Sequence, residues 1–504
     1  MNASTTNKNA KKKNYRRLIL LVSVVAIVSI IAAVMIGVMI RNDEPIEMVN
    51  LAETYKGEIL DVEGNLLVPF DVAYPEAFAS GEYEYRKDAL LLKMEDGYNG
   101  RLTRTLKKCG FVSIEPFVDT VNGKWYEAKL AEGEDISIVI QKVRSLSYVV
   151  TADYDYILKT TDAEVGSADE GIDISDINHK VHGNGQLKNQ WFLKAAGIQE
   201  AWKEMEKLGL EPGGSSSVVV AVIDTGVDYT HPDLKDNIWV NAGEIPDNGI
   251  DDDGNGYVDD YYGFNAVANR GSGMDVHGHG THVAGIIAAS NNKEGVVGIA
   301  YNAKIMPIAA GQATGVFLQN DIAEAIIYAY EMGADVINMS FGGAACSIVV
   351  QDALMTAYSR ATLVASAGNS GMPNQAADYY PIPLPNYPAA LSYVIGVMSV
   401  DRSGVESGFS NWDTVAFNKV EYEVYAPGEG IYSTLAGGGY GNLSGTSMSA
   451  PVVSGIAALL RSCYTDRDMY PSKFIQAQLC ATSEDTATEC VFLFFLRSII
   501  ACRR

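Results

Sequence analysis

The chain has 504 residues, a formal net charge of -24 and six cysteines. This length can form one large domain with a substantial core and a smaller domain beside it. The negative charge argues against a nucleic acid as partner, because it repels phosphates, and it is compatible with an extracellular protein that holds cations. Six cysteines are too few for a dense disulfide framework, and their pairing cannot be read from the sequence.

The start of the chain predicts a membrane anchor. A basic tail over residues 1–17 precedes an apolar stretch without charged residues over 18–40. At about 1.5 Å per residue, a helix of this length crosses an apolar layer of about 30 Å, and it exceeds the roughly 7 to 15 residues of a cleavable signal core. We expect a signal anchor with the basic tail in the cytoplasm and everything after Arg41 outside. A removed signal peptide is the alternative.

The next segments predict a small domain between two linkers. Residues 41–83 are interpreted as a linker, and strand-like and helical patterns alternate in the order β-α-β-β-α-β over 84–160. This order is typical of a ferredoxin-like α+β domain. Residues 161–186 are polar and rich in Asp, Gly and Ser, which predicts an exposed linker that a protease can cut.

Two candidate functional residues occur in the first part of the large domain predicted over 187–485. Asp224 follows the β-branched, apolar run 217–223, which predicts a buried parallel strand. Asp224 would then lie at the carboxyl end of that strand, where open α/β sheets bind ligands. His279 begins a predicted helix that continues through small apolar residues at 283–289.

Two further candidates lie downstream. Asn369 follows a predicted buried strand over 361–367. Ser447 precedes an apolar helical run over 452–460, with Pro451 expected in the first turn, where a missing amide hydrogen costs little. The Ser447 hydroxyl would then lie in the positive field of a helix N-terminus, beside free backbone donors.

A serine, a histidine and an aspartate in these settings indicate nucleophilic catalysis. A serine hydroxyl is a poor nucleophile at neutral pH, so it needs a base to take its proton and a carboxylate to orient that base. The motifs Asp224-Thr225-Gly226, His279-Gly280-Thr281-His282 and Gly445-Thr446-Ser447-Met448-Ser449 occur in this order. At these motifs the chain resembles the subtilisin-like serine peptidases, the subtilases of peptidase family S8, over roughly residues 190–483.

The resemblance implies a fold and a reaction. The fold is α/β, with a mainly parallel central sheet between layers of helices, preceded by an α+β propeptide over 84–160 that chaperones folding and inhibits the enzyme. The reaction is the hydrolysis of peptide bonds through an acyl-enzyme on Ser447, with Asn369 and the backbone amide of Ser447 facing the oxyanion. Self-processing within 161–186 would release the mature enzyme. The substrate-binding residues that the resemblance implies are Ser340, Phe341, Gly342, Gly343, Ala367 and Gly368.

Two segments are candidates for binding Ca²⁺. The acidic loop 247–260 carries oxygen-bearing side chains at alternate positions before Gly256, as EF-hand loops do, although an aspartate replaces the closing glutamate. A solvated acidic turn is the alternative. If the loop 247–260 binds Ca²⁺, its candidate ligands are Asp251, Asp253, Asn255, Tyr257 and Asp260. A second segment resembles the strong calcium site of subtilases, with candidate ligands at Asp233, Ser290, Asn292, Glu294 and Val296.

Three other interpretations compete with a peptidase. A catalytically silent surface protein could use the same fold to bind peptides. A lipid esterase is disfavoured because no Gly-x-Ser-x-Gly motif surrounds Ser447. A zinc site at His277, His279 and His282 is disfavoured because the His-Glu-x-x-His pattern is missing. The expected partners are peptide or protein substrates, the propeptide and a membrane, with the protein acting as a monomer.

The last segment, residues 486–504, is atypical for the family. Its apolar run at 490–496 is too short to cross a membrane. A buried terminal strand and an altered end are both compatible with it.

Overall fold

The computed structural model describes residues 59–74, 78, 83–161, 187–372, 385–413, 421–485 and 491–493. The predicted membrane anchor at 18–40, most of the predicted linker 161–186 and most of the tail 486–504 lie outside the described residues. Within the described part of the chain, no helix combines the length and the apolar character needed to cross a bilayer. The anchor therefore stays a prediction.

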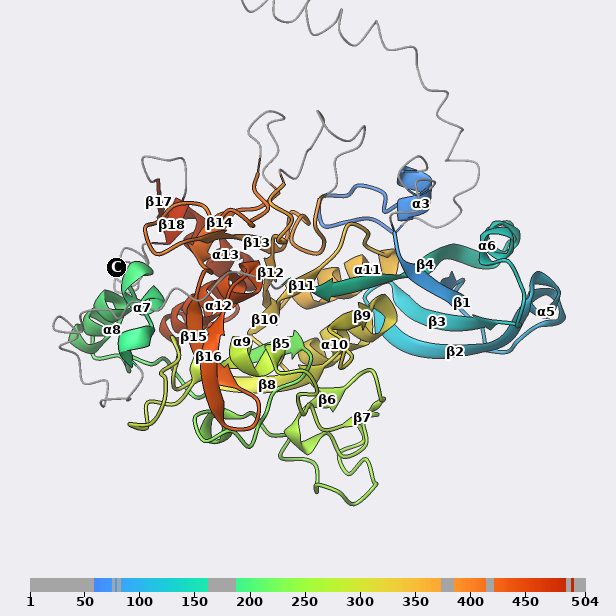
Figure 1. Cartoon of the computed structure of the whole chain (residues 1–504). Coiled ribbons are helices and arrows are strands. Elements are labelled where there is room, and N and C mark those ends of the chain that lie inside the picture. The colour runs from blue at the N-terminus through green and yellow to red at the C-terminus, as the bar shows by residue number, and fades with distance from the viewer. Residues whose placement is uncertain are drawn as a thin grey trace, which may run out of the picture. The chain divides into compact units, whose positions relative to one another are not determined.

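A ten-stranded sheet forms the centre of the large domain (Figure 1). Its strands run in the order β17-β18-β14-β13-β12-β10-β5-β8-β6-β7, and the neighbouring pairs from β14 to β6 are parallel. The six longer strands are β5 (Val219–Asp224), β8 (Lys304–Ala309), β10 (Val336–Met339), β12 (Thr362–Ser366), β13 (Ile395–Val400) and β14 (Val424–Pro427). These strands are apolar runs, as expected for a parallel sheet that is buried on both faces.

Helices cover both faces of this sheet. Val220 and Val222 of β5 share one apolar core with residues of α9 (His279–Ala288) and α12 (Thr446–Cys463). Ala221 and Ile223, which point to the other face of β5, are buried as well. Two helices that contact strands from outside that core are α10 (Gln319–Glu331) and α11 (Ile348–Tyr358). The remaining helices of the large domain are α7 (Phe192–Ala195), α8 (Ile198–Lys207) and α13 (Ser472–Thr482).

Short strands complete the large domain. β6 (Phe264–Asn265) and β7 (Arg270–Gly271) extend one edge of the large sheet, and β15 (Ile431–Leu435) pairs with β16 (Gly439–Leu443) as a hairpin. At the other edge, β18 (Val491–Leu493) pairs in parallel with β14 and antiparallel with β17 (Ser483–Asp485). Three residues of the atypical tail therefore form a strand that lies between β14 and the edge strand β17.

The small domain has the predicted β-α-β-β-α-β order. Its strands form an antiparallel sheet in the order β4-β1-β3-β2, and both helices contribute apolar residues to one core with this sheet. The elements are β1 (Tyr85–Met94), α5 (Arg104–Cys109), β2 (Phe111–Thr120), β3 (Gly123–Leu130), α6 (Ile136–Arg144) and β4 (Val149–Thr160). A short helix, α3 (Phe70–Ala73), precedes them and places Phe70 in the same core.

The end of β4 leaves the small domain and enters the large one (Figure 1). Residues 157–159 pair antiparallel with β9 (Val316–Leu318), and residues 159–160 pair antiparallel with β11 (Phe341–Gly342). The chain thus inserts as a strand between two strands of the large domain. An extended segment held in this way is bound through its backbone, whatever its side chains are.

Candidate active site

Asp224 and His279 form a buried hydrogen-bonded pair. β5 ends at Asp224 and α9 begins at His279, and the distance between Asp224 Oδ1 and His279 Nδ1 is 2.7 Å. Their exposed fractions are 0% and 2%. Burial raises the pKa of Asp224, and the neighbouring imidazole opposes that shift. A carboxylate at Nδ1 makes that nitrogen the donor, so Nε2 of His279 is left to act as the acceptor of a proton.

Asp275 fixes the start of α9 and was missed in the sequence. The backbone amides of His277 and Gly278 donate to its Oδ1, and the amide of Thr281 donates to its Oδ2 at 2.9 Å. Thr225, next to Asp224, also donates its hydroxyl to Asp275 at 2.9 Å. A carboxylate that accepts from the first amides of a helix stabilises that helix start. The available signal was an acidic residue four positions before His279.

Ser447 lies in the first turn of α12, which begins at Thr446. The expectation that Ser447 precedes the helix and that Pro451 stands in the first turn was wrong, because the helix starts earlier and Pro451 lies in its second turn. Pro451 cannot donate to the carbonyl of Ser447, four residues before it. The hydroxyl of Ser340 donates to that carbonyl instead, at 2.9 Å. A side chain thus replaces the missing backbone donor.

The amide of Asn369 has a fixed orientation. The backbone N–H and the hydroxyl of Thr446 both donate to Asn369 Oδ1 at 2.9 Å. Asn369 Nδ2 is thereby turned outward, and it donates to the carbonyl oxygen of Thr161. Thr446 was not singled out in the sequence, since its contact with Asn369 spans 77 positions.

Thr161 is held between the catalytic candidates. Its Oγ1 lies 2.5 Å from Ser447 Oγ and 2.7 Å from Ser366 Oγ, while the hydroxyl of Ser447 donates to the carbonyl of Ser340 at 2.9 Å. Thr161 is 8% exposed. The prediction that the linker is exposed from residue 161 onward was therefore wrong for its first residue, because Asn369 and the serines bind it. Ser447 is itself 0% exposed, so the site is covered in this state.

The predicted substrate strand lies beside the inserted end of β4. Phe341 and Gly342 form β11 and pair with Thr160 and Lys159. Ser340 precedes them with its carbonyl toward Ser447, and Gly343 leaves room for Leu158, whose Cγ would lie 3.2 Å from a Cβ there. These four predicted residues are brought together around one extended segment.

The other two predicted substrate residues contribute backbone to the surrounding structure. The amide of Ala367 donates to the carbonyl of Val397, and its own carbonyl accepts from Asn411. The amide of Gly368 donates to the hydroxyl of Thr446, and Gly368 has φ +102°, a conformation that favours glycine. Both residues position Asn369, which follows them.

Asn386 closes one side of this region and could not be placed from the sequence. A Cβ built on Gly342 would lie 2.1 Å from Asn386 Nδ2, and one on Gly368 would lie 3.1 Å from its Cγ. Asn386 Nδ2 donates to the carbonyl of Ser366 at 3.0 Å. The two glycines are therefore needed for close approach of Asn386 to the segment that holds Thr161.

The acidic loop brings three carboxylates together. Oxygen atoms of Glu244, Asp251 and Asp253 all lie within 4.8 Å of one another. Asp251 and Asp253 were predicted, whereas Glu244 was missed because it stands three positions before the loop 247–260. A cluster of carboxylate oxygens is the donor set that Ca²⁺ prefers, so these three residues fit such an ion.

The remaining predicted ligands of that loop have other contacts. Asp260 accepts from Tyr328, Asn241 and Asn255 at 2.8 to 3.1 Å. The Asn255 side chain therefore directs its N–H₂ group, and not its oxygen, toward Asp260. The ring of Tyr257 packs against Tyr328 and Phe264, with centroids 4.8 and 4.7 Å apart.

The second predicted calcium segment holds its carboxylate with hydrogen-bond donors. Asp233 accepts from Asn292 Nδ2 and from the amide of Val296, both at 2.9 Å, and from the hydroxyl of Tyr440. Burial raises the pKa of Asp233. The backbone N–H of Glu294 donates to Asn292 Oδ1, which fixes the orientation of the Asn292 side-chain amide. Glu244, Asp251 and Asp253 accept from backbone amides as well, but among the described residues they are the group that brings three carboxylates within 4.8 Å of one another, so they offer the better cation site. The Asp233 site stays a prediction, including the loop position Ser290.

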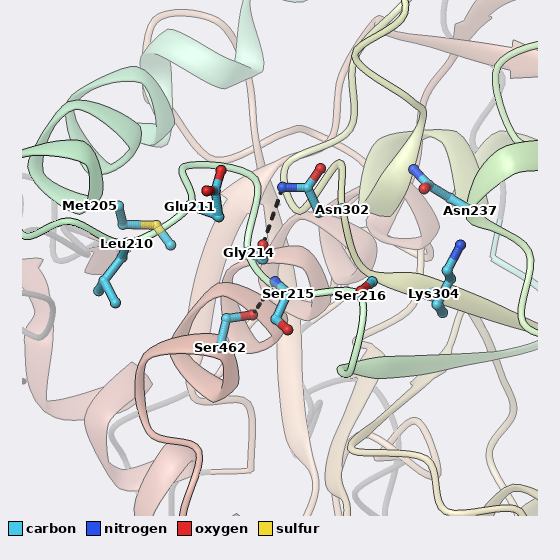
Figure 2. A pocket seen from close by; sticks show the side chains of 10 residues that line it. All are labelled: Met205, Leu210, Glu211, Gly214, Ser215, Ser216, Asn237, Asn302, Lys304 and Ser462. Atoms are coloured by element: carbon cyan, nitrogen blue, oxygen red, sulfur yellow. Dashed lines mark hydrogen bonds between the residues drawn. The ribbon is translucent and has the colours of Figure 1, made fainter.

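A separate cavity of about 420 Å³ lies on another part of the large domain (Figure 2). Lys304, the first residue of β8, lines the cavity, so the cavity lies near the amino ends of the parallel strands. Asp224 is the last residue of β5 and therefore lies at the opposite, carboxyl end. Asn302 donates to the carbonyl of Gly214 at its edge, at 3.2 Å. None of the predicted functional residues lines this cavity.

Comparisons with known proteins agree with this architecture. The thermophilic serine proteinase of Bacillus sp. (strain AK1) is 39% identical over 251 residues, covering 49% of this chain and 53% of the relative. Thermitase of Thermoactinomyces vulgaris is 36% identical over 249 residues, covering 49% and 76%. Subtilisin-like protease 1 of Plasmodium berghei is 35% identical over 295 residues, covering 56% and 48%. The chain thus spans about half the length of the first curated relatives that it matches.

A structural neighbour and a family model add to these relatives. The crystal structure of fervidolysin from Fervidobacterium pennivorans matches with a TM-score of 0.61 and 24% identity, covering 83% of this chain and 61% of fervidolysin, which supports the fold. The model of the subtilase family matches residues 215–494, more than half of the chain. The chain therefore belongs to the subtilase family.

Proposed function

We propose that this protein is a serine endopeptidase that hydrolyses peptide bonds through an acyl-enzyme. Ser447 is the nucleophile, His279 the general base and acid, and Asp224 the carboxylate that orients the imidazole. The observation that carries this assignment is the position of Thr161. Asn369 Nδ2 donates to the backbone carbonyl of Thr161, and the side-chain hydroxyl of the same residue contacts Ser447 Oγ. Acyl transfer needs a hydrogen-bond donor at the carbonyl oxygen of the substrate and a serine hydroxyl beside the same residue.

The residues of this chain divide the reaction among them. The Ser447 hydroxyl, which donates to the carbonyl of Ser340 at rest, turns its proton toward His279 Nε2. The serine oxygen then attacks the carbonyl carbon, and the oxyanion accepts from Asn369 Nδ2 and from the amide of Ser447, which is free in the first turn of α12. His279 passes the proton to the leaving nitrogen. Water, activated by the same imidazole, releases the acyl group from Ser447.

The first substrate is proposed to be the chain itself. Residues 157–161 lie extended in the large domain, and Thr161 ends the bound segment at Asn369. We therefore place the scissile bond directly after Thr161, at the start of the predicted processing linker 161–186. The segment 84–160 then serves as a propeptide, and the mature enzyme begins after the cut.

Buried aspartates support an inhibitory role of the small domain. Asp155 Oδ1 accepts from the amides of Gln319 and Asn320 at the start of α10, at 2.9 and 3.2 Å. Asp153 accepts from the amide of Ile348 at the start of α11, at 2.9 Å. These buried hydrogen bonds to the first amides of two helices hold the small domain in place after the bond is cut. Its last strand continues to block the substrate strand until it is removed.

Calcium is proposed to bind the acidic loop. Glu244, Asp251 and Asp253 would hold the ion, which would neutralise three carboxylates that otherwise repel one another. The ion has a structural role in this proposal, because the loop leads into β6 and β7, which extend one edge of the sheet.

The location of the enzyme is proposed from the N-terminal segment. A membrane anchor at residues 18–40 with a cytoplasmic tail would place the catalytic domain outside the cell, and the cut after Thr161 would release it. The net charge of -24 suits a calcium-binding protein in that compartment.

A fluorophosphonate probe tests the proposed function. The refolded full chain should be cut once after Thr161, and the probe should then attach to Ser447, as mass spectrometry of the intact protein and its peptides can establish. The Ser447→Ala chain is the control and should be neither cut nor labelled. A wild-type chain that folds but is neither cut nor labelled would support a silent peptide-binding protein instead.

A further inference from the structure

The hydroxyl of Thr161 contacts a second serine besides the nucleophile. Ser366, the last residue of β12, lies with its Oγ 2.7 Å from Thr161 Oγ1. We propose that Ser366 recognises a hydroxyl on the residue whose carbonyl is attacked, so that the enzyme prefers to cut after threonine or serine. This inference rests on the proposed function and specifies its substrate class.

The contact is buried. Ser366 is 0% exposed and Thr161 is 8% exposed. Among the residues that the structure describes, Thr161 Oγ1 is the one recorded hydrogen-bond partner of Ser366 Oγ. Removal of the threonine hydroxyl would therefore leave a serine hydroxyl buried without its partner. Such a loss costs far more than the same change at the surface.

The surroundings favour a small polar side chain. Asn386 lies against both Gly342 and Gly368, and its Nδ2 donates to the carbonyl of Ser366. The amide of Asn386 thus narrows the space next to Ser366 and lines it with polar atoms. A valine has nearly the shape of threonine but lacks the hydroxyl, so it tests the hydrogen bond without changing the fit.

The nucleophile offers a competing explanation for any effect of the threonine hydroxyl. Thr161 Oγ1 also lies 2.5 Å from Ser447 Oγ, so a valine at position 161 could slow cleavage through that contact alone. The two explanations differ in one respect. If Ser366 recognises the hydroxyl, the advantage of threonine over valine must depend on Ser366.

Four full-length chains separate the two explanations: wild type, Thr161→Val, Ser366→Ala and the double variant. The rate of self-cleavage after residue 161 is followed by intact mass during refolding. We expect Thr161→Val to be slower than wild type by about tenfold or more, as for a site built to bind a substrate hydroxyl. In the Ser366→Ala background, the threonine and valine chains should differ by about twofold or less. Thr161→Ser should retain most of the wild-type rate.

Matched controls accompany these chains. Ser370→Ala makes the same chemical change at an exposed position four residues later, and it should keep the full preference for threonine. Ser366→Cys keeps the size of the side chain, weakens its hydrogen bond and serves if Ser366→Ala does not fold. It should reduce the preference for threonine over valine.

Two results would overturn the inference alone. One is an equal rate of self-cleavage for the wild-type and Thr161→Val chains. The other is a threonine preference of the same size with and without Ser366, which would assign the effect to Ser447. A wild-type chain that is neither cut nor labelled by the fluorophosphonate probe would instead contradict the proposed function itself.

Discussion

The catalytic assignments differ in how much of the rate each residue should carry. Ser447→Ala removes the nucleophile and should lower turnover of a peptide substrate by about 10⁶, the size of this effect in subtilisin. Asn369→Ala removes one oxyanion donor and should lower it by about 10² to 10³. Variants with unchanged melting temperatures should be compared in kcat after active enzyme has cut their propeptide and the propeptide has been removed, because an uncut propeptide would block the substrate strand. Comparable residual activities of the two variants would show that these roles are wrongly assigned.

Asp275 should matter for stability at the start of α9. Its carboxylate accepts from three backbone amides and the Thr225 hydroxyl. Asp275→Ala should lower the free energy of unfolding by about 1 to 2 kcal/mol, as for loss of a helix N-cap. Denaturant unfolding of the Ser447→Ala chain can measure this change. The exposed Asp236 offers a control, and a loss for Asp236→Ala as large as for Asp275→Ala would contradict the assignment.

At the scale of elements, docking of β4 should depend on pH through Asp153. Burial, followed by repulsion from Asp71, raises the pKa of Asp153 to about 7 from its ordinary value of 3.8. The docked state therefore holds a proton that the unfolded chain has lost. The corresponding stability is fully present below about pH 4 and is lost as the pH rises through about 7.

The pH dependence can be isolated by substitution. Unfolding of the uncut Ser447→Ala chain between pH 4 and 8 should show stability falling over this range, and the added change Asp153→Asn should flatten that part of the curve, because asparagine cannot ionise. Asp247→Asn, on an exposed residue, should leave the curve unchanged. Parallel curves for the Asp153 and Asp247 variants would contradict the shifted pKa.

At the scale of the whole molecule, calcium should raise the melting temperature. A ligand at about 100 times its Kd stabilises the native state by about 2.7 kcal/mol, and each kcal/mol corresponds to about 2 to 4 °C in a domain of this size. Chelation should therefore lower the melting temperature of the Ser447→Ala chain by about 5 to 10 °C. Asp251→Asn should abolish this response, whereas Asp247→Asn should keep it. No response in the unmodified chain would exclude the proposed calcium site.

Local patterns predicted the residues whose neighbours along the chain define their setting. Asp224 and His279 were placed correctly at a strand end and a helix start, because an apolar β-branched run and a run of small apolar residues each specify one element. The order of the small domain was predicted for the same reason. The start of α12 was misplaced, since the donor that replaces the Pro451 amide comes from Ser340, far away in the sequence.

Partners brought together by folding could not be predicted in this way. Glu244 and Asn386 carry no local motif, and the motif around Ser447 does not reveal that Thr446 binds Asn369. Each of these residues gains its role from a contact with a distant segment or a neighbouring loop. The same holds for Thr161, which we predicted to lie in an exposed linker because the residues that follow it in the sequence are polar. Its burial follows from strand pairing of β4 with β9 and β11.

The sequence by itself therefore determined the family, the chemistry and the order of the elements, because these depend on residue types and on periodicities within short windows. Tertiary structure alone decided which residue of the inserted segment contacts Ser447, which second serine contacts Thr161 and which acids gather around one point. Hydrogen bonds and charge clusters act over a few ångströms, and only the folded backbone brings positions 161, 366 and 447 within that range.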